Sequence, residues 1–118
     1  MLQILDIKKE NVITTIAIGK LHQKDIEKVH PIIHTILDKG LKIRWYFEMQ
    51  DFEGWNINGF WEDLKIDAAH EKEYEKIAIV GKEQWHDWVA RFMKPFTNAE
   101  IKYFDIKQKS NAQKWIEI

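Results

Sequence analysis

The hydrophobic pattern of this chain switches repeatedly between a period of two and a period of 3.6 residues, which is typical of strands alternating with helices. Period-two or continuous apolar segments predict strands over Leu2–Lys8, Val12–Gly19, Ile43–Gln50, Ile77–Val80 and Glu100–Ile106. Apolar stripes at helical spacing predict helices over Asp25–Lys39, Gly59–Tyr74, Glu83–Met93 and Ser110–Ile118. In the first of these helices Asp25 has the chemistry of an N-cap, and Pro31 should kink the helix or shift its start.

The connections between these segments predict how the strands pair. Only the polar turn Lys9-Glu10-Asn11 separates the first two strands, so they should form an antiparallel hairpin. Each later strand follows a helix, and such connections are right-handed crossovers between parallel strands. We therefore predict an α/β fold, with a mixed sheet of about five strands (an N-terminal antiparallel hairpin, the remainder parallel) and about four helices.

Composition narrows the class of protein. The chain of 118 residues is 45% hydrophobic and 31% charged, which fits one folded domain over residues 1–118. Its 18 basic and 19 acidic residues leave no positive excess for a phosphate backbone, so no nucleic-acid partner is predicted. Cysteine is absent, which excludes disulfides and thiol catalysis. With no signal peptide or membrane-spanning run recognisable, we expect a cytoplasmic protein.

An aromatic cluster follows the third predicted strand and is the first candidate for a ligand site. Phe52 and Trp55 belong to a predicted loop over Asp51–Asn58, and Phe60 and Trp61 to the start of the next helix. Ligands of open parallel sheets favour the crevice at the carboxyl ends of the strands, where these residues should lie. They could line an apolar pocket or touch a partner or a bilayer; alternatively, they cap the end of an ordinary core.

Two further residues complete the predicted ligand-binding set. Lys82 follows Gly81, which should end the fourth strand, and a cation opening a helix can contact an anion there. Trp85 lies in the same segment, on the apolar stripe of the predicted helix. The chain has no glycine-rich phosphate loop and no dinucleotide fingerprint, so no cofactor is predicted.

Other chemistry-bearing residues do not form a recognisable catalytic or metal site. His30 and His34 share one helix face, but a zinc site needs three or four ligands. Glu48, Asp51 and Glu53 supply carboxylates without an evident nucleophile or second base. We therefore predict no catalytic residues, no metal and no enzymatic activity.

The chain resembles the SpoIIAA-like family, which shares the fold of STAS domains and of CRAL-TRIO lipid-exchange domains. The resemblance is carried by the hairpin Ile4–Gly19 and by three further segments. These segments are Asp25-Ile26-Glu27-Lys28-Val29-His30-Pro31, Tyr46 to Trp55, and Lys76-Ile77-Ala78-Ile79-Val80-Gly81 before Trp85-His86-Asp87-Trp88. The resemblance implies a STAS-like, non-enzymatic module.

Two functions follow from this resemblance. The lipid-exchange relatives imply a non-catalytic binding domain for an apolar or lipid-like small molecule, with transient peripheral contact with a membrane. The alternative is a STAS-type regulatory module that binds a partner protein. Some STAS domains are switched by phosphorylating a serine just after the third strand, but the only serine here is Ser110, so such a module would lack that switch. The sequence does not determine the oligomeric state, and a homodimer is one alternative.

Overall fold

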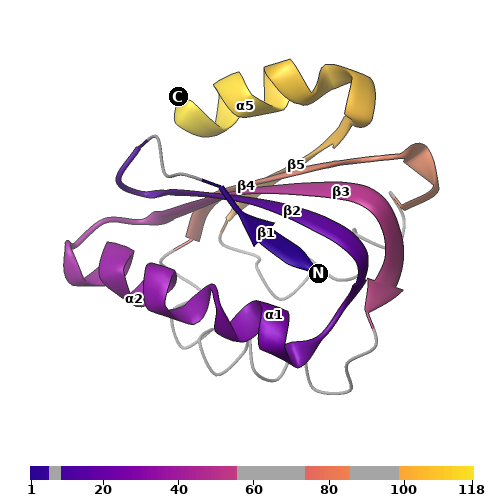
Figure 1. Cartoon of the computed structure of the whole chain (residues 1–118). Helices are drawn as coiled ribbons and strands as arrows, with labels where there is room; N and C mark the ends of the chain where they lie inside the picture. Colours follow the sequence, from indigo (N-terminus) through magenta and orange to yellow (C-terminus); the bar gives the residue numbers. More distant parts are fainter. Residues whose placement is uncertain (6–8, 56–73, 86–98) are drawn as a thin grey trace.

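The computed structural model of the chain describes residues 1–5, 9–55, 74–85 and 99–118. Its strands are β1 (Leu2–Ile4), β2 (Val12–Leu21), β3 (Ile43–Trp55), β4 (Tyr74–Gly81) and β5 (Glu100–Asp105). They form one five-stranded sheet in chain order (Figure 1). β1 pairs with β2 antiparallel, and every later pair is parallel, as predicted.

Helices cover both faces of this sheet. The described α-helices are α1 (Gln23–Glu27), α2 (His30–Asp38) and α5 (Lys109–Glu117), with short 3-10 turns η2 (Glu83–Trp85) and η3 (Ile106–Gln108). α1 and α2 lie on one face and α5 on the other (Figure 1). The predicted count of about four helices is not borne out by the described residues. The helix predicted over residues 59–74 lies outside them except for Tyr74, which begins β4, and so does most of the helix predicted over residues 83–93.

The single helix predicted from Asp25 is wrong, since the segment forms two short helices. Asp25 is the third residue of α1 and not its N-cap: its carboxylate reaches back to accept from the backbone N–H of His22 at 2.8 Å. It also accepts from the Leu2 N–H at 3.3 Å, which ties β1 to α1. Pro31 lies in the first turn of α2, where its missing N–H costs nothing, and the chain therefore breaks before it.

Alternation along β3 separates two apolar clusters. Ile43, Trp45 and Phe47 pack with Ile33 and Ile36 of α2, as the period-two pattern predicts. On the opposite face, Tyr46 packs under α5, in the cluster Val12, Tyr46, Ala78, Val80, Ala112 and Ile116. Fully burying one such aliphatic side chain stabilises the fold by about 1.5–3 kcal/mol. Apolar clusters therefore pack on both faces of the central strands.

The loop predicted over Asp51–Asn58 is wrong for its first part, because β3 continues to Trp55. The register with β2 jumps from Ile18 opposite Gln50 to Gly19 opposite Phe52, so Asp51 is the extra residue of a bulge. Asp51 has φ 45° and Gly19 has φ 66°. Aspartate tolerates this left-handed conformation better than most residues, and glycine adopts it without strain.

Candidate functional site

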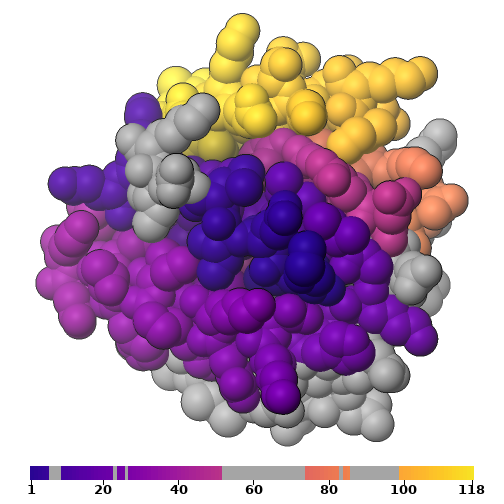
Figure 2. Space-filling view, viewed as in Figure 1, coloured from indigo at the N-terminus to yellow at the C-terminus, as the bar shows by residue number. Residues whose placement is uncertain are grey.

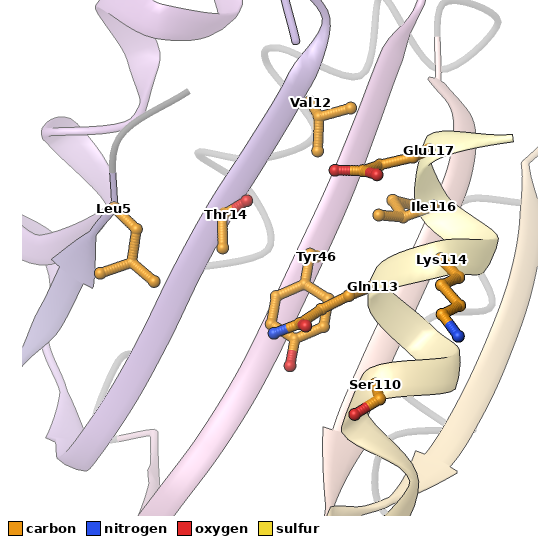
Figure 3. A pocket seen from close by; sticks show the side chains of 9 residues that line it. All are labelled: Leu5, Val12, Thr14, Tyr46, Ser110, Gln113, Lys114, Ile116 and Glu117. Atoms are coloured by element: carbon orange, nitrogen blue, oxygen red, sulfur yellow. The ribbon is translucent and has the colours of Figure 1, made fainter. Parts of the chain in front are cut away.

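A hollow of about 470 Å³ lies between the N-terminal strands, β3 and α5, and we call it the α5 hollow (Figure 3). Its volume is in the range of small-molecule sites, roughly 300–1,000 Å³. The space-filling view shows α5 (yellow) covering this face of the sheet next to the indigo N-terminal strands (Figure 2). The hollow is lined by residues of β2, β3, α5 and the segment after β1: Leu5, Val12, Thr14, Tyr46, Ser110, Gln113, Lys114, Ile116 and Glu117.

The lining of the α5 hollow is mixed. Aliphatic surface comes from Leu5, Val12 and Ile116, which belong to three separate segments of the chain. Side chains that hydrogen-bond without charge come from β2 and α5, and Figure 3 shows Gln113 lying over the ring of Tyr46. Apolar walls with a few convergent polar groups are the usual composition of a binding site for a small molecule.

A buried carboxylate lies next to Tyr46. The Tyr46 hydroxyl donates to Glu48 Oε1 at 2.7 Å, and the Gln50 amide donates to Glu48 Oε2 at 2.6 Å. Tyr46 is 1% exposed and Glu48 3%. Burial, then the hydrogen bond to Glu48 and the charge of that carboxylate, raise the pKa of Tyr46, while a hydrogen bond with Gln113 lowers it in part. The phenol is therefore neutral and directs its proton towards Glu48.

Three cations hold the C-terminal end of α5 against the sheet. Lys9 Nζ donates to the Glu117 carbonyl at 3.0 Å, Arg44 Nη1 to that of Ile116 at 3.0 Å and Lys76 Nζ to that of Trp115 at 3.3 Å. The last carbonyls of a helix have no partner within it and carry the negative end of its dipole. Cations at this end therefore satisfy the carbonyls and stabilise α5.

Arg44 also binds the side chain of Glu75. Its Nε and Nη2 donate to the two carboxylate oxygens at 2.9 and 3.3 Å. This hydrogen bonding and the charge of Arg44 lower the pKa of Glu75, against a smaller opposing effect of burial. The guanidinium thereby joins β3, β4 and α5 in one polar contact.

A second, much smaller cavity of about 50 Å³ lies between the bulge of β3 and the carboxyl end of β4, and we call it the strand-end cleft. It is lined by Met49, Asp51, Lys82, Gln84 and Trp85. The carbonyl of Lys82 accepts from the Tyr103 hydroxyl and from the Trp85 N–H, which fixes the turn into η2. The Lys82 side chain is exposed, and Trp85 packs partly buried against the apolar cluster on the α2 side.

The predicted ligand residues are only partly placed by the structure. It brings Lys82 and Trp85 together in the strand-end cleft. Phe52 and Trp55 lie in the extension of β3, but their side chains are outside the description, and Phe60 and Trp61 lie outside the described residues.

The α5 hollow was missed by sequence reasoning. One signal for it was available: Tyr46 is an aromatic residue on the alternation of β3 that otherwise carries Arg44, Glu48 and Gln50. The described residues hold no group of three His, Asp or Glu side chains arranged for a metal ion. In this part of the chain, no helix combines the length and apolar character needed to span a bilayer.

These features define a small mixed α/β module with a ligand-sized hollow under its C-terminal helix. The chain belongs to the SpoIIAA-like family, whose sequence profile matches residues 12–117. It is also similar to the crystal structure of an uncharacterized protein from the DUF3478 family, with a SpoIIAA-like fold, from Shewanella loihica PV-4. That similarity has a TM-score of 0.72 at 26% identity and covers 98% of this chain and 92% of the other. No curated protein matches the sequence significantly.

Proposed function

We propose that this chain is a non-catalytic binding domain that holds a small apolar or lipid-like ligand in the α5 hollow. The observation that carries the proposal is the hollow itself, with about 470 Å³ of space and aliphatic surface from Leu5, Val12 and Ile116 beside its polar side chains. The strand-end cleft has about 50 Å³ among the described residues, which is room for little more than solvent. A SpoIIAA-like fold is compatible with a non-catalytic module.

The hydrogen bonds around the hollow support binding over catalysis. Glu48 already accepts from two donors and is almost fully buried, so its carboxylate is not presented to a substrate. The Tyr46 proton is committed to Glu48, and the raised pKa of this phenol makes it a poor source of a reactive phenolate. Neither group is placed as a general acid or base.

Native mass spectrometry of the gently purified protein, followed by solvent extraction, tests the proposal. A stoichiometric bound mass that extracts as an apolar molecule is the expected result. A matched pair of variants then locates the ligand: Ser110→Trp places a bulky ring at the hollow, whereas Asn111→Trp places the same ring on α5 outside its lining. We expect Ser110→Trp to lose the bound mass and Asn111→Trp to keep it.

Two outcomes would overturn the proposal. If both variants keep the ligand, it lies elsewhere, and the aromatic set Phe52, Trp55, Phe60 and Trp61 with the strand-end cleft becomes the proposed place. If the protein has a clean apo mass and adding lipids causes no shift, the STAS-type module that binds a partner protein replaces the carrier. Flotation with liposomes tests the transient membrane contact separately.

A further inference from the structure

We infer that the α5 hollow selects an uncharged ligand that carries a hydroxyl or amide group on a short apolar body. This inference rests on the proposed function and specifies its ligand class. It follows from the charges around the hollow and from the hydrogen-bonding groups that line it.

Negative charge on the protein disfavours an anionic ligand. The Glu48 carboxylate lies 2.7 Å from the Tyr46 oxygen, and the Glu117 side chain lines the hollow directly. Glu48 is almost fully buried, so water screens its field weakly in the direction of Tyr46. A carboxylate or phosphate next to Tyr46 would therefore be repelled.

Positive charge disfavours a cationic ligand. Lys9 and Arg44 bind the carbonyls of Glu117 and Ile116 at the end of α5, where both of these residues line the hollow. Lys114 belongs to the lining itself, although Figure 3 shows its ammonium group directed away from Tyr46. An ammonium ligand would face these cations, because the Glu117 carboxylate of the lining lies at the same end of α5, and the buried Glu48 already accepts from two donors.

The uncharged side chains fit a hydroxyl or an amide. Thr14, Ser110 and Gln113 line the hollow, and each can donate as well as accept a hydrogen bond. The Tyr46 hydroxyl gives its proton to Glu48, so towards the hollow its oxygen can only accept. Gln113 already hydrogen-bonds with Tyr46. A ligand hydroxyl or amide can both donate to and accept from Thr14, Ser110 and the remaining capacity of Gln113, whereas a carboxylate can only accept and an ammonium can only donate.

Three probes with the same six-carbon body test this selectivity: 1-hexanol, hexanoate and hexylamine. Their affinities for the intact chain are measured at pH 7 from the shifts of the backbone amides of Thr14 and Gln113 in ¹H–¹⁵N spectra. We expect hexanol to bind at least about tenfold more tightly than either ion. This is the penalty expected when one hydrogen-bonding group is buried in the complex without a partner. Gln113→Leu should weaken hexanol binding several-fold, whereas Gln108→Leu, an exposed glutamine outside the hollow, should not change it.

The outcomes separate the inference from the proposed function. Hexanoate or hexylamine binding as tightly as hexanol, with shifts at Thr14 and Gln113, would overturn the inferred ligand class and leave the hollow as a binding site. If Gln113→Leu and Gln108→Leu change hexanol binding equally, Gln113 makes no hydrogen bond to the ligand, and the inferred ligand class is overturned as well. If no probe shifts these amides, the hollow binds nothing of this size, and both proposals fail.

Discussion

The hydrogen bond between Tyr46 and Glu48 is a buried, charge-assisted contact, and a double-mutant cycle measures its strength. Glu48→Leu leaves the Tyr46 hydroxyl buried with its acceptor gone, and Tyr46→Phe leaves Glu48 with only the donor on Gln50. Each single change should cost about 1–3 kcal/mol of unfolding free energy. The double variant removes both polar groups, so it should be more stable than the sum of the singles by about 1.5–3 kcal/mol.

This magnitude is readily measured in a chain of 118 residues. Unfolding entropy near the midpoint is about 2.1 cal/mol/K per residue, or about 250 cal/mol/K for the chain, so 2 kcal/mol corresponds to about 8 °C in Tm. Urea denaturation at pH 7, followed by circular dichroism and by tryptophan fluorescence, gives the four free energies. Neither Tyr46→Phe nor Glu48→Leu removes a tryptophan, so the same fluorescence probe serves all four proteins.

A second cycle serves as the control. Thr35 is exposed on α2, on the other side of the sheet, and its hydroxyl donates to the Pro31 carbonyl. Thr35→Ala and Tyr46→Phe should add to within about 0.5 kcal/mol. If Tyr46 and Glu48 are equally additive, the contact contributes no coupling, and the reasoning about a phenol committed to its carboxylate is refuted.

Three further predictions concern separate features. Glu75 has a lowered pKa in the folded chain, so its ion pair with Arg44 stabilises the fold at neutral pH, and this contribution is lost as the pH falls through that lowered pKa. Because Glu75 is 39% exposed, Glu75→Gln should cost at most about 0.5 kcal/mol at pH 7 and less in acid, and a difference that does not shrink in acid urea titrations would contradict this. At Gly81, an added Cβ would overlap the Met49 Cε and lie 3.1 Å from the Tyr103 hydroxyl. Because Cε is the end of a flexible side chain that can move aside, Gly81→Ala should cost at most about 1 kcal/mol in urea unfolding and less in a Met49→Ala background; an equal cost in both would rule out this overlap as the cause. Asp51→Val should lose about 1–2 kcal/mol because a branched side chain is strained at φ 45°, while Asp51→Gly should be tolerated to within about 0.5 kcal/mol; equal Tm values for the two variants would show that the bulge relaxes.

The sheet could be predicted from the sequence because its determinants are local. The polar residues Lys9-Glu10-Asn11 before β2 correctly predict its hairpin with β1, although β1 ends at Ile4 and not at Lys8. Alternation along β3 identifies Ile43, Trp45 and Phe47 as the face packed against α2. The bulge could not be predicted in the same way. It depends on which residues of β2 lie opposite Asp51, and this long-range register is set by the pairing of Gly19 with Phe52. The aspartate alone reads equally well as the start of a loop.

The α5 hollow escaped prediction for a related reason. Leu5, Tyr46 and Gln113 are far apart in the sequence, and only the order of strands and the docking of α5 bring them to one place. Glu48 and Gln50 lie on the polar alternation of β3, which is expected to face water. The sequence pattern does not reveal that α5 covers this side and leaves the carboxylate 3% exposed. Lys82 and Trp85, by contrast, were predicted together because one short segment carries both.

The attachment of α5 has a consequence for its response to ionic strength. Its C-terminal end is held by the charges of Lys9, Arg44 and Lys76, whereas Ala112 and Ile116 attach it through apolar burial. Added salt shortens the Debye length from about 8 Å at 0.15 M to about 3 Å at 1 M and weakens the exposed Lys9 contact most, but it does not screen the apolar contacts. Added salt should therefore weaken the attachment of α5 to the sheet at the C-terminal end of the helix. Even an uncharged ligand beneath it should show an affinity that falls with ionic strength, through the helix that covers it.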